Sequence, residues 1–206
     1  MNQWGASFFR YLIFGTVFLL AACASQEQIA PQATVGLTQV RAQAVQLKQQ
    51  LSRTTDAART LSKSSGSELS SSLESVSANL DSLKSTLGVS RQAVRSAQDQ
   101  ITAYFANWEK QSRTMSEEMQ KTSKERQAQA AASFQSLQAS IGEVRTGLSQ
   151  YMYDMSEIVK YLRTDQTPAG LQAVSSRLND TIAGQPTIQR NLDAVISNID
   201  AIQSTK

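Results

Sequence analysis

The chain has 206 residues, and its 20 Lys and Arg against 17 Asp and Glu leave a formal net charge of +3 at pH 7. It has no histidine, which removes the commonest general base and the commonest metal ligand together. No basic cluster or aromatic platform of a nucleic-acid binder accompanies the small positive charge. We therefore expect a protein that is not an enzyme, with no cofactor, no metal, no nucleic acid and no small-molecule substrate.

Residues 1–22 have the features of a secretory signal peptide. Arg10 supplies a positive charge, and the apolar run YLIFGTVFLL follows it before the small pair Ala21 and Ala22. A membrane-spanning helix needs about 20 apolar residues, whereas the apolar part of a signal peptide has about 7 to 15. The apolar run at 11–20 therefore has the length of the apolar part of a signal peptide. We expect cleavage after Ala22.

Cys23 is the only cysteine of the chain and comes directly after this segment. Leu20-Ala21-Ala22-Cys23 resembles the lipobox of bacterial lipoproteins. The resemblance implies a diacylglycerol thioether on Cys23, removal of the signal before it, and acylation of the new amino terminus with chains such as palmitate. One buried acyl chain binds a membrane marginally, whereas two or more hold firmly. The alternative is a cysteine that merely follows a signal peptide.

Ala24 follows Cys23, where an aspartate would be the signal for retention in the inner membrane of enterobacteria. By resemblance to lipoproteins of that type, we expect a location in the inner leaflet of the outer membrane, facing the periplasm. The polar segment 23–34 is expected to be a lipidated, flexible tether. Residues 35–206 then form a single helical coiled-coil domain.

Apolar residues after this tether recur at steps of three and four, which is the spacing of a helical seam. The first seam runs from Leu37 to Leu61, with Thr54 at the one place where an apolar residue is missing. The Ser-rich segment 62–72, which contains Gly66, changes the phase of the seam. This change predicts a turn or a stutter.

A second seam runs from Leu69 to Trp108 and ends in a polar span. We expect a helix–helix turn near 111–121. Thr122 and Glu125 have the spacing of a capping box, which predicts a helix start there.

A third seam from Phe134 to Leu162 keeps a strict alternation of three- and four-residue steps over nine apolar positions. A disordered chain would not maintain this spacing. Pro168 suits the first turn of a further helix, and Gly184 with Pro186 predicts that this segment divides into two short helices. The fold class is therefore all-α: an elongated antiparallel helical hairpin or coiled-coil bundle with short carboxyl-terminal helices.

One long stretch resembles a known family. AYFANWEKQSRTMSEEMQKTSKERQAQAAASFQSL and the later IVKYLRTDQTPAGLQAV look like an uncharacterised family of proteobacterial coiled-coil lipoproteins, grouped as a domain of unknown function. The resemblance covers about residues 101–174. It implies a coiled-coil lipoprotein and no activity.

Two groups of aromatic residues are candidate partner contacts. Phe105 and Trp108 either form an exposed anchor for a partner or close the end of a core that has little apolar bulk. Tyr153 and Met152 fall outside the third seam, so they could face a second helix, a partner protein or a second copy of the chain.

Lys206 is a candidate for attachment to the cell wall. The murein lipoprotein is a lipid-anchored helix whose terminal lysine is linked to peptidoglycan, and this chain shares the anchor, the heptads and a final Lys. Two functions follow. In the first, the protein presents a helical rod to an envelope protein or to itself; in the second, it is a structural tether between outer membrane and peptidoglycan. A carboxylate-dependent hydrolase is a third, weaker alternative.

Overall fold

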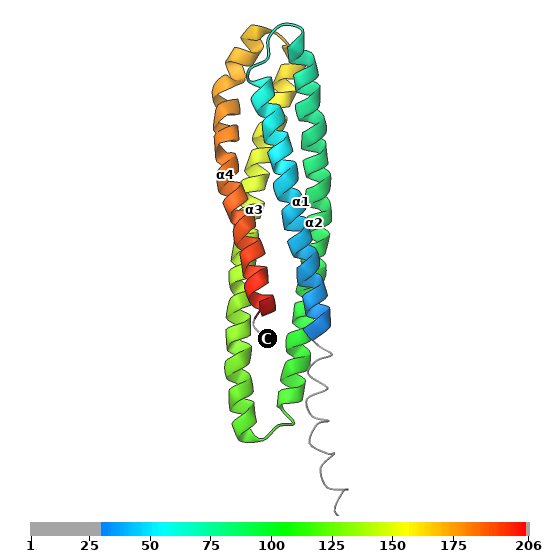
Figure 1. The fold of residues 1–206 in the computed structure, drawn as a ribbon, viewed down its shortest axis with the longest axis vertical. Coiled ribbons are helices and arrows are strands. Elements are labelled where there is room, and N and C mark those ends of the chain that lie inside the picture. The colour runs from blue at the N-terminus through cyan, green and yellow to red at the C-terminus, as the bar shows by residue number, and fades with distance from the viewer. Residues whose placement is uncertain (1–29, 205–206) are drawn as a thin grey trace, which may run out of the picture.

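The computed structural model describes residues 30–204, so the predicted signal peptide, Cys23 and Lys206 lie outside the described residues. Within the described part, the chain forms four helices and no strand: α1 (Ala30–Leu61), α2 (Glu68–Ser112), α3 (Glu117–Thr164) and α4 (Pro168–Ser204). The predicted all-α helical bundle is confirmed. Short turns join successive helices, which run antiparallel in an elongated rod (Figure 1).

Each helix packs against two others, in the cyclic order α1, α2, α3, α4. The α1–α2 interface is the most extensive and the α2–α3 interface the least. The predicted seams face the centre of this ring, where they bury one side of every helix. The most deeply buried side chains, none more than 1% exposed, come from all four helices and include Leu51, Leu61, Leu83, Leu148, Met155, Ile158, Leu178, Leu192 and Ile199.

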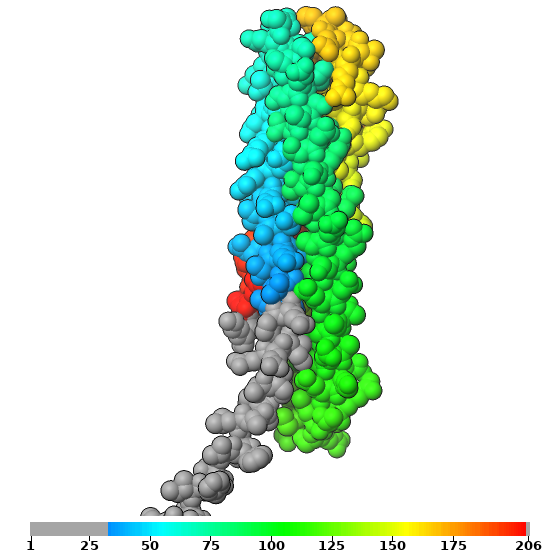
Figure 2. Space-filling view, turned by 90° about the vertical axis from the view of Figure 1, so that its right-hand side faces the viewer, coloured from blue at the N-terminus to red at the C-terminus, as the bar shows by residue number. Residues whose placement is uncertain are grey.

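The helices differ in length, and this difference shapes one end of the rod. α2 (45 residues) and α3 (48 residues) are longer than α1 (32 residues) and α4 (37 residues). At 1.5 Å per residue, the excess of α2 over α1 is about 20 Å. The α2–α3 hairpin therefore projects past the first turn of α1 and the last turn of α4 (Figures 1 and 2).

The amino-terminal boundary differs from the predicted tether. α1 begins at Ala30, so residues 30–34 of the segment predicted to be flexible are helical. Tertiary contacts explain the difference. Ala33 is buried, and Nε2 of Gln203 on α4 donates a hydrogen bond to the carbonyl of Thr34 over 3.3 Å.

The two predicted interruptions near α1 and α2 are turns. Gly66 has a φ of 55°, a value that favours glycine, so the segment between α1 and α2 is a turn and not a stutter. The second turn lies at 113–116, inside the predicted span, but the predicted capping box is wrong. α3 begins at Glu117, and Thr122 lies in its second turn with Oγ1 bonded to the carbonyl of Glu118. Glu117 and Glu118 explain the earlier start, because carboxylates are favourable in a first helical turn.

The predicted division of the carboxyl-terminal segment into two short helices is also wrong, because α4 continues through Gly184 and Pro186. Proline removes the N–H that would bond the carbonyl of Ile182, which costs about 3 kcal/mol in a helix interior. Packing outweighs that cost. Leu178 before the proline and Leu192 after it are both buried on the same side of the helix, and each stabilises the docked helix by about 2 kcal/mol.

Candidate functional site

The part of the α2–α3 hairpin that projects from the rod is called here the hairpin tip, residues 104–126. Phe105 on α2 meets Phe134 on α3 edge to face, with ring centroids 5.6 Å apart. Nε1 of Trp108 donates a hydrogen bond to Oγ of Ser123 over 2.9 Å. Both predicted contact residues are half-buried and join the two helices. Their rings supply the apolar contact that the polar sequence around them lacks.

A shallow hollow of about 290 Å³ lies beside Trp108 on the hairpin tip. Met119, which is 58% exposed, forms part of its wall. An unbranched, polarisable side chain of this kind adapts to different partners. The remaining lining residues are Met115, Glu118, Thr122, Ser123 and Arg126. The exposed Met119 and the half-buried Trp108 thus form an apolar surface at the hairpin tip.

Charges at the hairpin tip are mixed. Glu109 and Arg113 form an ion pair over 2.6 Å on the exposed side of α2. Burial raises the pKa of Tyr104, and the charge of Arg126 opposes that rise. The surface can therefore bind through apolar contact with charged groups around it.

Tyr153, the third predicted contact residue, lies elsewhere. Its ring is 59% exposed, and the guanidinium carbon of Arg177 on α4 lies 5.6 Å from the ring centroid. Ser123, level with Trp108, and Tyr153 are both on α3, about 45 Å apart along the helix axis. The structure thus brings Phe105 and Trp108 together and keeps Tyr153 apart from them.

Arg177 also binds Asp154, next to Tyr153 on α3. Its Nη2 lies 2.6 Å from Oδ1 of Asp154. Burial would raise the pKa of Asp154, but hydrogen bonds from Arg177 and Gln150, with the charge of Arg177, outweigh burial and lower it. This group of residues fastens α3 to α4 and covers one face of the tyrosine ring.

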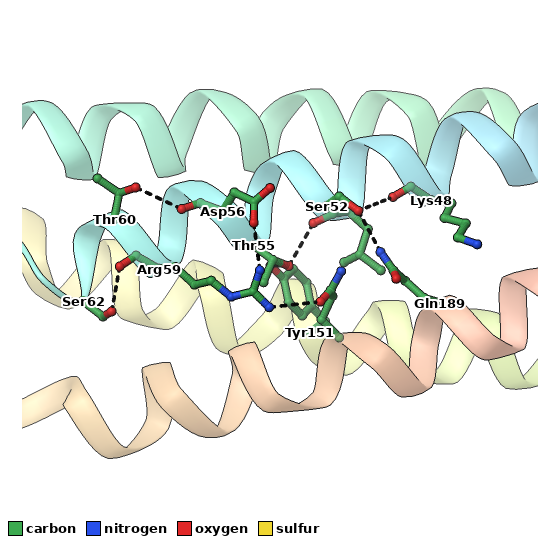
Figure 3. A network of polar contacts seen from close by, with 11 residues as sticks. Lys48, Ser52, Thr55, Asp56, Arg59, Thr60, Ser62, Tyr151 and Gln189 are labelled. Atoms are coloured by element: carbon green, nitrogen blue, oxygen red, sulfur yellow. Dashed lines mark hydrogen bonds and ion pairs between the residues drawn. The ribbon is translucent and has the colours of Figure 1, made fainter.

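Polar contacts in the four-helix section, the innermost of them buried, link α1 to α3 and to α4, and sequence reasoning did not find them (Figure 3). Thr55 on α1 and Tyr151 on α3 share a hydrogen bond of 2.9 Å. On the α4 side, Gln189 donates to Ser52 over 2.7 Å. Burial raises the pKa of Tyr151 to about 12, and the hydrogen bond between Tyr151 and Thr55 only partly opposes this rise. Together with the bond from Nη2 of Arg59 on α1 to Oε1 of Gln185 on α4, these contacts fasten α1 to both α3 and α4.

The sequence signal of these contacts was Tyr151 in the third seam; Thr54 in the first seam is a comparable core residue that lies outside them. Both occupy core positions with polar atoms, and a buried hydroxyl requires a partner. The hydroxyl of Thr54 donates a hydrogen bond to the carbonyl of Gln50 on the same helix, over 2.8 Å. Which helix supplies the partner of Tyr151 could not be read from spacing alone.

Polar contacts also define how the two ends of the described chain lie. Nε of Arg41 on α1 is 2.7 Å from Oδ1 of Asp200 on α4. Gln203, near the end of α4, donates to Oγ1 of Thr38 over 3.0 Å. The last turn of α4 therefore lies beside the first turns of α1, and both ends leave from the same end of the four-helix section (Figure 1).

None of the four described helices is both long enough and apolar enough to cross a membrane. Among residues 30–204, no three Asp, Glu, His or Cys side chains gather in a group that could hold a metal ion. Comparison of the chain with protein-family models, with curated proteins and with solved structures finds no match in any of the three.

Proposed function

We propose that this chain is a non-enzymatic lipoprotein of the bacterial outer membrane, anchored by acyl chains on Cys23 and presenting its helical rod to a protein partner in the periplasm. The observation that supports the proposal best is the position of the hairpin tip. It projects from the same end of the rod at which α1 begins, and Cys23 precedes α1 by few residues.

The distances fit a surface held close to the bilayer. Cys23 and Ala30 are seven Cα–Cα steps apart, and a fully extended chain would span at most about 25 Å over them. The hairpin tip extends past α1 by about 20 Å, from the lengths of the helices. An anchored rod would therefore keep the tip in the layer next to the membrane. Restricting both partners to this layer raises their effective concentration for each other.

The expected partner is a protein that covers Met119 and the exposed edge of Trp108. Tryptophan contributes much of the free energy at protein interfaces, and methionine adapts its shape to the partner. Helices present such residues on one face to a groove or to a second helix. Self-association through the hairpin tip is the second outcome that the same surface allows.

The alternative function, a tether between membrane and peptidoglycan, gains less support from the geometry. A helix as long as α3 spans about 72 Å, which would make the rod a good spacer if its attachments were at opposite ends. Gln203 and Thr38 are hydrogen bonded instead. A lipid on Cys23 and a murein link on Lys206 would both leave from one end, so the length of the rod would not separate them.

Mass spectrometry of the protein purified from membranes tests the anchor. We expect a chain that begins at Cys23 and carries the mass of a diacylglycerol and an acyl group. A chain that begins at Met1, or a free thiol on Cys23, would overturn the proposal. Digestion of the sacculus followed by mass spectrometry tests the alternative, since a murein adduct on Lys206 would establish tethering.

Crosslinking in intact cells tests the docking surface. A photoreactive phenylalanine analogue replaces Met119, and in a matched control it replaces Tyr161, which is 43% exposed near the opposite end of the rod. We expect an adduct with a second protein, or with a second copy, from position 119 alone. Equal adducts from both positions, or none from 119, would contradict docking through the hairpin tip.

A further inference from the structure

The α2–α3 interface contains small residues where the rest of the core has leucine. Along the seam of α2, Leu87 is followed by Ser90, Val94 and Ala97, and on α3 Gly142 lies opposite this stretch. Small side chains leave space between two helices because the backbone of the bundle cannot collapse around each one. This is also the least extensive interface of the bundle.

Two adjoining cavities, of about 470 Å³ and 300 Å³, occupy that space. They share lining residues, among them Val94 and Ile141, and therefore form one groove along the α2–α3 interface. Its inner wall comes from the other two helices, with Leu47 on α1 and Leu192 on α4. The larger cavity alone has the size of a small-molecule site.

Three arginines line the groove at its exposed side: Arg91 and Arg95 on α2 and Arg145 on α3. The Phe105–Phe134 contact sets the antiparallel register, which brings all three arginines to about the same level of the rod. In the described part of the chain, none of the three forms an ion pair. No acidic residue lines either cavity. The groove thus combines apolar walls with uncompensated positive charge.

We propose that this groove binds a single-chain anionic amphiphile, with its acyl chain along the α2–α3 interface and its carboxylate or phosphate at the three arginines. Guanidinium groups bind both anions through paired hydrogen bonds, so the shared chemistry is an anionic head on one acyl chain. A free fatty acid and a lysophospholipid are its two sources. The sequence predicts no small-molecule substrate, and the inference adds a small-molecule ligand to that expectation.

An acyl chain suits the groove better than a peptide does. The walls are mainly apolar, with the amides of Gln43, Gln98 and Gln138 as polar exceptions. Most backbone N–H and C=O groups of a peptide in the groove would therefore find no partner, and burying such groups without hydrogen bonds is costly. An acyl chain has no polar group to satisfy. Each methylene that enters the groove should raise the affinity about fourfold until the groove is full.

Gly142 offers a variant that fills the groove without disturbing the helix. A Cβ added at Gly142 meets no atom within 4 Å, and the residue lines the larger cavity. Gly142→Leu should therefore project into the groove, while leucine favours the helix more than glycine does. Gly184→Leu is the matched control, because Gly184 on α4 has the same open surroundings and does not line the groove.

The experiment uses the full chain in phosphatidylcholine nanodiscs. The probes are a diazirine-labelled palmitic acid, a labelled lysophosphatidic acid of the same chain length and a labelled hexadecanol. We expect at least one anionic probe to label peptides within 87–101 or 138–145. The anionic probe that labels these peptides shows whether the ligand is a fatty acid or a lysophospholipid. Gly142→Leu should reduce this labelling at least tenfold, and Gly184→Leu should leave it unchanged.

A variant with Gln in place of Arg91, Arg95 and Arg145 tests the head group. We expect it to bind the anionic probes at least tenfold more weakly and hexadecanol as the unchanged chain does. Labelling that is equal in the two leucine variants, labelling outside the groove, or equal binding of acid and alcohol by the unchanged chain would each overturn the proposal. So would displacement of the probe by an acidic peptide but not by unlabelled palmitate.

Discussion

Tyr151 on α3 reaches across the centre of the rod to Thr55 on α1, and their hydroxyl oxygens lie 2.9 Å apart (Figure 3). α1 and α3 are diagonal in the ring of helices and share no backbone contact. Thr55 is fully buried, and Tyr151 is 3% exposed. Oγ1 of Thr55 also bonds the carbonyl of Leu51 over 2.9 Å. The pair therefore links the two halves of the bundle through one hydrogen bond at its core.

The two partners of this bond should respond unequally to substitution. Tyr151→Phe leaves Thr55 bonded to Leu51, so we expect it to lower the free energy of unfolding by about 1 kcal/mol. Thr55→Val leaves the phenol hydroxyl buried without its partner, and the cost should be about 2 kcal/mol. Urea denaturation followed by circular dichroism measures both values.

The double variant is the control for this prediction. With both hydroxyls removed no buried polar atom lacks a partner, so its cost should be about 1 kcal/mol less than the sum of the two single costs. Strict additivity would show that the hydrogen bond does not form.

Alkaline pH should destabilise the protein through Tyr151. Burial raises the pKa of Tyr151 to about 12, whereas an unfolded tyrosine has a pKa of about 10. The folded state therefore holds the proton more tightly, and its stabilising contribution, complete below pH 10, is lost as the pH rises from about 10 to 12. The full loss is about 3 kcal/mol, from two pKa units.

Tyr151→Phe isolates this contribution from those of the other groups of the chain. The difference in unfolding free energy between the unchanged chain and Tyr151→Phe should shrink and then change sign between pH 10 and 12. A difference that stays constant with pH would contradict the raised pKa.

Pro186→Ala should stabilise the protein, because α4 is continuous through this position. Alanine restores the N–H that bonds the carbonyl of Ile182, and we expect a gain of up to about 3 kcal/mol. Thermal unfolding measures it. If α4 instead divided at Pro186, alanine would give no increase in the melting temperature, and the original prediction of two helices would be correct.

Two glycines should respond in opposite directions to alanine. Gly66→Ala should cost about 1 kcal/mol, since the φ of 55° in the α1–α2 turn is unfavourable for a side chain. Gly88→Ala should add up to about 1 kcal/mol of stability, because Gly88 lies inside α2 with open space around it. Chemical denaturation of both variants is the measurement. A stabilised Gly66→Ala would exclude the turn as described.

Much of the fold could be predicted from local spacing. The seams identified all four helical regions, and the turn near 113–116 and the start of α4 at Pro168 lie where the sequence placed them. Local signals were wrong where packing opposed them. Pro186 marks a helix break, yet Leu178 and Leu192 hold both sides of α4 to the core. Thr122 resembles a helix cap, yet α3 begins earlier, at Glu117.

The candidate sites depended more strongly on the tertiary structure. Phe105 and Trp108 could be selected from the sequence because large rings stand out in a polar chain. Their partners Phe134 and Ser123 could not, since the register of two helices depends on every contact between them. The groove beside Gly142 is a property of two seams that face each other, and neither seam reveals it alone.

The sequence by itself determined that the chain forms long amphipathic helices, because a spacing of three and four residues places apolar side chains on one face of each helix. It also placed the single cysteine, Cys23, at the end of the segment that resembles a lipobox. Only the tertiary structure decided which helix faces meet and that Tyr151 bonds Thr55 across the bundle. It also decided that the beginning of α1 and the end of α4 lie side by side, where Gln203 bonds Thr38. The physical reason is that helix formation follows from neighbours within four residues, whereas pairing depends on side chains far apart in the chain, 96 residues for Thr55 and Tyr151 and 165 for Thr38 and Gln203.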